Sequence, residues 1–181
     1  MANVRYGING YGQLELNQVA FRRSGRIEAQ CALDGKVFNK EKPAENGMLL
    51  AVNNIERVVT LANGNFPVAL NYTSEHMYDN RANALKDFKL EPGSFLPRMG
   101  YLGAGDKYTT NCLAYAEGAF DDDGAFESAI KGVTATNRLY AHACPETGAH
   151  LINTTAENAV AIVLGATTMP DGQFAVKFQA L

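Results

Sequence analysis

The C-terminal stretch that decides the fold reads AVAIVLGATT (residues 159–168), MPDG (169–172) and QFAVKFQAL (173–181). The proline presets the first position of a turn, and the Asp-Gly pair supplies the positive φ that a tight reversal needs. In the second run Phe174, Val176 and Phe178 alternate with smaller or polar residues, which is the period of a strand with one apolar face. This pattern predicts a β-hairpin.

Strand-like segments recur upstream of the hairpin at intervals of ten to twenty residues, separated by Gly, Pro, Asn or Asp. They are Arg26–Leu33, Met48–Asn53, Glu56–Leu61, Val68–Tyr72, Met99–Leu102, Tyr108–Tyr115 and Arg138–Cys144. The sequence therefore predicts a mainly β fold, with α+β as the alternative. The expected architecture is a single antiparallel β-sandwich or barrel-like domain.

Helical signals are few. One short helix is expected over Tyr78–Phe88, and a further helical turn over Ala125–Lys131. Residues 1–25 contain several Gly, Asn and Gln residues and no sustained apolar period, so they are expected to form an extended N-terminal arm or a fringe strand folded back on its own domain. Residues 26–181 then form one β-rich domain.

Composition narrows the classes of function. The 181 residues carry a net charge of −3, and their Lys and Arg residues are scattered, so no stripe suited to a nucleic-acid backbone exists. No apolar run approaches the roughly 20 residues that a membrane-spanning helix needs. The chain is expected to be soluble and made in the cytoplasm, without nucleic-acid or membrane partners. Its three cysteines, Cys31, Cys112 and Cys144, are expected to be reduced and buried.

Two clusters could hold a metal ion. His142 and Cys144 would share one face of a strand, and His150 could return to them after a loop. The alternative, half-buried strand residues, is favoured because no second ligand pair has zinc spacing. The aspartates at 121–123 suggest a calcium loop, but calcium loops alternate their ligands, so an acidic loop is favoured.

Catalytic and cofactor motifs are missing. Residues 7–12 and 109–114 resemble segments of glyceraldehyde-3-phosphate dehydrogenase, but Glu15 occupies the position of the third glycine of a dinucleotide turn. Tyr108 stands where that family has its nucleophilic cysteine. No serine or cysteine lies in a nucleophile motif. We therefore expect no enzyme activity, cofactor or small-molecule substrate.

The middle of the chain resembles small virion proteins of tailed bacteriophages, most closely capsid decoration (cement) proteins. The segments that carry this resemblance are PAENGMLL (43–50), NYTSE (71–75), FLPR (95–98) and GDKYTTN (105–111). The resemblance implies a virion-located, non-catalytic subunit that binds the major capsid protein lattice and copies of itself. Many identical weak contacts on a closed shell would then act together.

This reading predicts interface residues in two places. Arg5, Tyr6 and Tyr11 would anchor a clamping arm, because small residues let an arm approach a partner closely while aromatic and arginine side chains fill pockets. Arg98 and Tyr101 form a second expected contact.

Two alternatives stay open from the sequence. The first is a tail-tube or head-completion subunit, which would assemble into rings. The second is a metal-dependent hydrolase that uses His142, Cys144 and His150.

Overall fold

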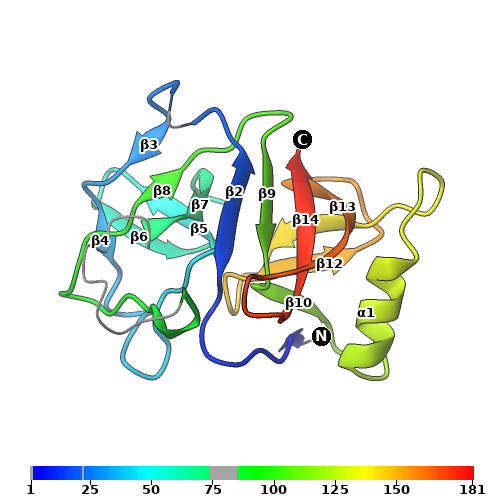
Figure 1. Cartoon of the computed structure of the whole chain (residues 1–181). Helices are drawn as coiled ribbons and strands as arrows, with labels where there is room; N and C mark the ends of the chain where they lie inside the picture. The colour runs from blue at the N-terminus through cyan, green and yellow to red at the C-terminus, as the bar shows by residue number, and fades with distance from the viewer. Residues whose placement is uncertain (1, 22, 74–84) are drawn as a thin grey trace.

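The computed structural model describes residues 2–21, 23–73 and 85–181. These residues form fourteen strands in two sheets, one α-helix and a short 3-10 helix. The expected mainly β, sandwich-like class is confirmed. Figure 1 shows the smaller sheet on the left, the larger sheet beside it and helix α1 at the right-hand edge.

The larger sheet has eight strands in the order β1-β10-β12-β11-β13-β14-β9-β2. Their bounds are β1 Asn3–Arg5, β2 Leu14–Gln18, β9 Lys107–Thr110, β10 Leu113–Ala116, β11 Tyr140–Ala143, β12 His150–Asn153, β13 Ala161–Thr168 and β14 Phe174–Ala180. Strands β9 and β10 are consecutive in the chain yet lie near opposite edges. The sheet therefore curls toward a barrel.

The smaller sheet has six strands in the order β3-β8-β7-β5-β6-β4. Their bounds are β3 Ile27–Glu28, β4 Ala32–Leu33, β5 Leu49–Asn53, β6 Val58–Leu61, β7 Val68–Asn71 and β8 Met99–Gly100. Every residue of β5 is buried, because this central strand has apolar neighbours on both faces.

The C-terminal hairpin forms as the turn chemistry predicts. Gly172 has φ +85°, and the Met169 amide donates to the Gln173 carbonyl oxygen at 2.8 Å. The side chains of Val176 and Phe178 are buried and Lys177 is exposed, which matches the predicted alternation. The hairpin then pairs with β9 through β14 and with β11 through β13, so it forms the middle of the larger sheet.

Helix α1 spans Asp123–Lys131 and contains the predicted turn. Asp122 caps its N-terminus, since the carboxylate accepts a hydrogen bond from the Ala125 amide at 2.8 Å. Phe126 and Ile130, four residues apart, are fully buried. The other expected helix, 78–88, lies largely outside the described residues, and only the 3-10 turn η2 (Leu85–Asp87) can be compared with it.

The prediction of an all-antiparallel sheet is wrong at two pairings. Strands β10 and β12 run parallel, and so do β4 and β6. Parallel neighbours need a long connection. Here α1 and β11 lie between the first pair, and β5 lies between the second, which allows both strands of each pair to run in the same direction.

Of the two expectations for residues 1–25, an extended arm and a fringe folded back on its own domain, the second describes the segment. β1 pairs with β10 and β2 pairs with β9, so this segment supplies both edge strands of the larger sheet. Tyr6, Leu14 and Phe21 are buried in the core. The apolar residues are too widely spaced to show a period, yet each one fills a place in the interior.

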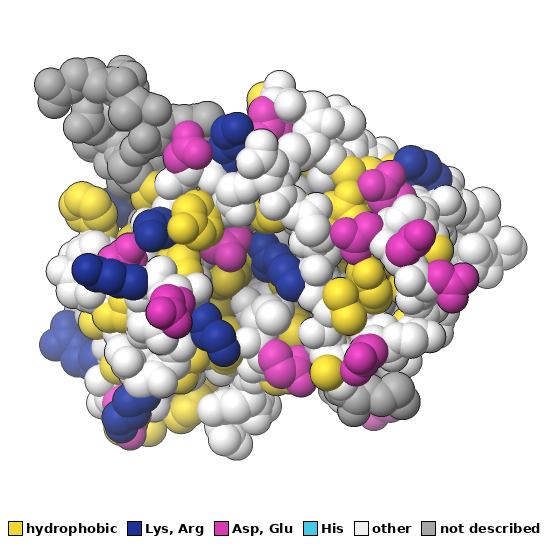
Figure 2. All heavy atoms as spheres, turned by 90° about the horizontal axis from the view of Figure 1, so that it is seen from below, with side chains coloured by type: hydrophobic (Ala, Val, Ile, Leu, Met, Phe, Trp, Pro, Cys, Tyr) yellow, Lys and Arg dark blue, Asp and Glu magenta, His cyan; other side chains and the backbone are white. Residues whose placement is uncertain are grey.

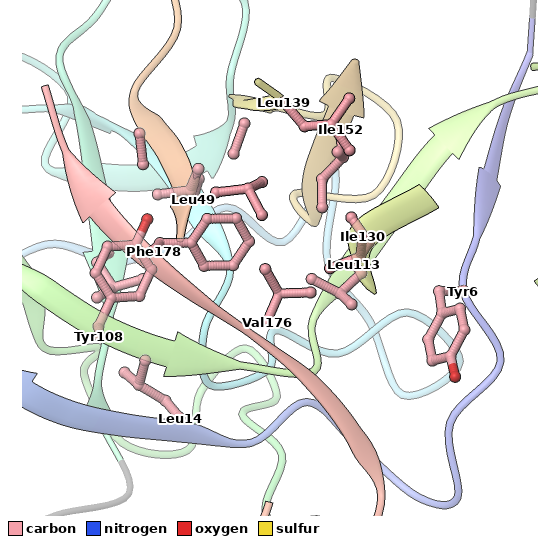
Figure 3. Packing of buried hydrophobic residues seen from close by; sticks show 14 of the residues in the cluster. Tyr6, Leu14, Leu49, Tyr108, Leu113, Ile130, Leu139, Ile152, Val176 and Phe178 are labelled. Atoms are coloured by element: carbon pink, nitrogen blue, oxygen red, sulfur yellow. The ribbon is translucent and has the colours of Figure 1, made fainter. Parts of the chain in front are cut away.

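The interior of the larger sheet holds a cluster of aromatic and aliphatic side chains (Figure 3). The rings of Tyr108 and Phe178 stack with centroids 5.5 Å apart. Both this cluster and a second one draw residues from the two sheets, and the segment 112–115 at the start of β10 lies between them, because Leu113 and Tyr115 face the first while Cys112 and Ala114 face the second. The molecule thus has two cores that share a wall.

No helix in the described ranges has both the length and the apolar character needed to cross a bilayer.

Candidate functional site

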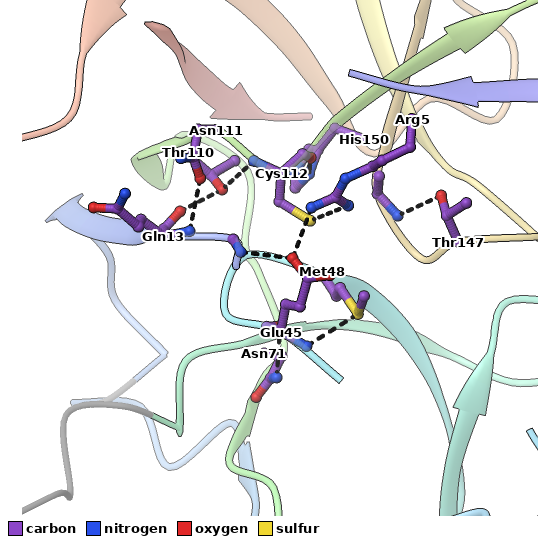
Figure 4. A network of polar contacts seen from close by, with 12 residues as sticks. Arg5, Gln13, Glu45, Met48, Asn71, Thr110, Asn111, Cys112, Thr147 and His150 are labelled. Carbon is purple, nitrogen blue, oxygen red and sulfur yellow. Dashed lines mark hydrogen bonds and ion pairs between the residues drawn. The ribbon is translucent and has the colours of Figure 1, made fainter. Parts of the chain in front are cut away.

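The two sheets meet at a polar seam where β1, the 43–48 loop and the β9–β10 connection come together (Figure 4). The Arg5 guanidinium donates through Nη2 to Glu45 Oε2 at 2.7 Å and through Nη1 to Cys112 Sγ at 3.0 Å. The Gly12 amide donates to the same carboxylate oxygen at 2.6 Å. Glu45 therefore ties the two ends of the Arg5–Gly12 connection to the smaller sheet.

Two glycines, Gly12 and Gly47, allow the two sheets to approach closely at the seam. Gly47 has φ +80°, and a Cβ on it would lie 2.2 Å from Thr110 Oγ1. A Cβ on Gly12 would lie 2.6 Å from the Asn46 carbonyl oxygen. Any side chain at either position would force the sheets apart.

Three of the four segments behind the virion-protein resemblance converge on this seam. The Asn71 side-chain amide donates to the Glu45 carbonyl oxygen at 2.8 Å, and the Gly47 amide donates to the Asn71 carbonyl oxygen at 2.9 Å. The Gln13 amide donates to Asn111 Oδ1 at 2.7 Å. The Asn71 bonds brace the smaller-sheet side of the seam and the Gln13 bond braces the larger-sheet side, while Glu45 joins the two sides through Arg5 and Gly12.

A recess opens beside the seam. Its volume is ≈ 380 Å³, and its walls include Tyr11, Val37, Phe38, Lys42, Met48 and Glu146, with Arg5 and Glu45 also lining it. Lys89 Nζ lies 5.5 Å from the centre of the Tyr11 ring. The recess combines apolar walls with a few polar groups, which is typical of a binding pocket.

Two fully buried titratable groups near the seam, Cys112 and His150, are neutral at pH 7. Burial raises the pKa of Cys112 to about 11, although the neighbouring Arg5 lowers it. Burial lowers the pKa of His150 to about 3. The thiol is therefore no ready nucleophile and the imidazole no effective base at this pH.

His150 is held by two defined contacts. Its Nδ1 lies 3.2 Å from the Cys112 carbonyl oxygen, which can only accept, so we assign the proton to Nδ1. Nε2 then accepts from the Tyr108 hydroxyl at 2.9 Å. Burial also raises the pKa of Tyr108, so both groups keep their protons in place.

The three residues considered as metal ligands, His142, Cys144 and His150, do not converge. His150 faces the first core, whereas Cys144 faces the second across the same sheet. His142 Nε2 lies 2.9 Å from the Thr155 carbonyl oxygen, and Cys144 Sγ donates to Glu146. Among the described residues, no group of three His, Cys, Asp or Glu side chains could hold a metal ion.

The acidic run has structural partners. Asp122 caps α1, and Asp123 accepts from the Tyr115 hydroxyl at 2.8 Å and the Gly7 amide at 3.0 Å. The run thus anchors α1 to β10 and to the N-terminal segment.

The expected interface residues lie in three settings. Arg5 is engaged in the seam, and Tyr6 is buried, with its hydroxyl donating to Glu127 Oε1 at 2.7 Å. Tyr11 lines the recess. Arg98 and Tyr101 flank β8 in the smaller sheet, where the Tyr101 amide donates to the Arg26 carbonyl oxygen. Arg5 and Tyr11 both line the recess, whereas Arg98 and Tyr101 do not.

Sequence reasoning missed Glu45 and Phe38 as site residues. Glu45 lies in the PAENGMLL segment without a role assigned to its side chain and Phe38 lies in no motif, so only their positions after folding identify them. In comparisons with protein families, curated proteins and solved structures, nothing matches the chain.

Proposed function

We propose that this chain is a non-catalytic virion subunit that binds the outside of a capsid lattice and stabilises it. The proposal rests on the contrast between the reactive side chains of the chain, which are buried, and its recess, which is accessible. Reactive side chains such as Cys112 and His150 are buried and neutral, while the accessible recess combines aromatic and aliphatic walls with five charged side chains, Arg5, Glu41, Lys42, Glu45 and Glu146. A recess of this kind favours binding over chemistry.

The recess is the proposed capsid contact. Tyr11 is its aromatic wall, and large aromatic side chains next to apolar pockets dominate binding energies in protein interfaces. The ion pair of Arg5 with Glu45 holds the chain on which Tyr11 sits, so the wall is preorganised. The resemblance to decoration proteins, carried by residues 43–50 and 71–75, supplies the class of partner.

The test is co-sedimentation of the purified protein with empty shells of the major capsid protein from the same phage. We expect wild-type protein to pellet with the shells and Tyr11→Ser to bind at least about tenfold more weakly. Leu164→Ser is the matched control, since Leu164 is an exposed apolar residue of β13 outside the recess. Wild-type protein that stays in the supernatant would refute the proposal, and equal binding by Tyr11→Ser would refute the recess as the contact.

A further inference from the structure

The loop between η2 and β8 presents two large apolar side chains to solvent. Phe95 is 68% exposed and Leu96 is 49% exposed. The turn before them is braced, because the Ser94 amide donates to the Glu91 carbonyl oxygen at 3.1 Å and Gly93 adopts φ +82°. A braced loop loses little conformational entropy on binding, so this pair forms a preorganised apolar knob.

An apolar groove lies beside α1. Its volume is ≈ 590 Å³, and its lining includes Ala116, Ala119, Phe120, Ala129, Leu139 and Ile152. Leu139 and Ile152 are buried, whereas Ala119 is exposed. Small side chains at the rim and larger ones below leave room for an incoming apolar side chain.

The knob and the groove lie at opposite ends of the molecule. In Figure 1 the green loop that leads into β8 reaches the left-hand edge, whereas α1 lies at the right-hand edge. The knob therefore cannot enter the groove of its own chain. A second copy could bring them together.

The charges at the two ends are complementary. Figure 2 shows acidic side chains predominating on the right-hand part of this face, whereas basic and acidic side chains are mixed on the left. Segment 117–138, around the groove, has five carboxylates and two cations. One of these cations, Lys131, pairs with Glu127 at 3.0 Å. Segment 86–98, around the knob, has three cations and two carboxylates, and one of the cations, Lys89, pairs with Glu91 at 2.9 Å. Arg98 is therefore the cation beside the knob that would face the acidic end of a neighbour.

We propose that copies of this chain associate head to tail, with the Phe95–Leu96 knob of one copy seated in the α1 groove of the next. The contact uses two different surfaces, so it generates a ring if its rotation closes and a filament if it does not. It does not depend on capsid binding. Apolar burial supplies the attraction, and the opposite charges at the two ends set the direction.

The experiment is sedimentation velocity of the purified full chain at concentrations up to about 1 mM, where even weak contacts populate oligomers. We expect wild-type protein to form rings or open chains. The knob variant F95S/L96S and the groove variant Ala119→Arg should each weaken association at least about tenfold, and Leu164→Ser should leave it unchanged. Circular dichroism of each variant reports whether the fold is kept.

A mixture of the two variants distinguishes the head-to-tail contact from a symmetric contact between two copies. The knob variant keeps an intact groove, and the groove variant keeps an intact knob. Only one contact can then form per pair, so the mixture should give 1:1 dimers and nothing larger. Wild-type protein that stays monomeric, folded variants that associate like wild type, or a mixture that stays monomeric would each overturn the proposal.

Discussion

The interior of the larger sheet is fully buried and the polar seam between the sheets is partly exposed, and the two regions contribute differently to the fold. In the interior Tyr108, His150 and Phe178 stack as neutral rings with one hydrogen bond between two of them. In the seam a charged pair, Arg5 and Glu45, is joined by amides and a thiol. Apolar packing is non-directional, whereas hydrogen bonds need defined geometry. The interior therefore supplies most of the stability, and the seam determines how the sheets meet.

The largest effect is expected from a loss of volume in the interior. Phe178→Ala removes a fully buried ring, and the cavity left behind should lower the free energy of unfolding by about 3–5 kcal/mol. Urea denaturation measures it. Leu164→Ala, at an exposed position, should change it by less than about 0.5 kcal/mol. Similar losses for the two variants would mean that the interior is not the main source of stability.

The next effect tests close approach in the seam. Gly47→Ala places a Cβ against Thr110 in a backbone with positive φ, and we expect a loss of about 3 kcal/mol. Gly64→Ala is the control, because Gly64 has φ +79° but no atom near its would-be Cβ. It should cost about 1 kcal/mol from the backbone alone. Equal losses would show that the sheets do not meet as tightly as described.

The third effect is a pH dependence that belongs to the interior. Burial lowers the pKa of His150 from 6.5 to about 3, so below pH 6.5 the unfolded chain binds a proton that the folded chain does not. Stability from this group is therefore complete above pH 6.5 and falls with pH, by about 1.4 kcal/mol per unit, down to about pH 3. At pH 5 the loss is about 2 kcal/mol.

Urea denaturation at pH 7, 6 and 5 measures this slope. His150→Gln cannot take up the proton, so its free energy of unfolding should fall less steeply with decreasing pH than that of the wild-type protein. The carboxylates contribute equally to both proteins. An identical slope in the two would contradict a neutral, buried His150.

The smallest effect is expected from removing charge in the seam. Glu45→Gln keeps the shape of the side chain but leaves Arg5 without its ion pair, and because the pair is partly exposed we expect a loss of about 1 kcal/mol. Lys131→Gln breaks the exposed pair with Glu127 and should cost about 0.3–0.5 kcal/mol. If Glu45→Gln lowered the free energy of unfolding as much as Phe178→Ala does, the seam would contribute as much stability as the interior, which would contradict this comparison.

Local signals predicted several elements well. The hairpin, α1 and the strands β5 to β7 were all visible as turn chemistry or apolar period. Strand β12 was missed, and β1 and β2 were expected only through the alternative of a fringe strand within residues 1–25. β1, with three residues, is too short to show an alternation. The predicted strand over 108–115 divides into β9 and β10, because Asn111 and Cys112 connect strands near opposite edges of the sheet.

The candidate site was only partly visible. Arg5 and Tyr11 were expected to contact a partner, and both line the recess, but Arg5 does so from inside the seam. Glu45, which holds it, lies 40 residues away in the chain. No local pattern connects two such residues, so their contact could not be derived from spacing.

By itself the sequence determined the strand-rich class, the tight C-terminal turn and the helical turn within α1, because each depends on the conformations of a few neighbouring residues. The tertiary structure decided that the N-terminal segment closes the larger sheet and that His150 is neutral. It also decided that the knob and the groove lie at opposite ends. These features depend on burial and on contacts between distant segments, which exist only once the chain has folded.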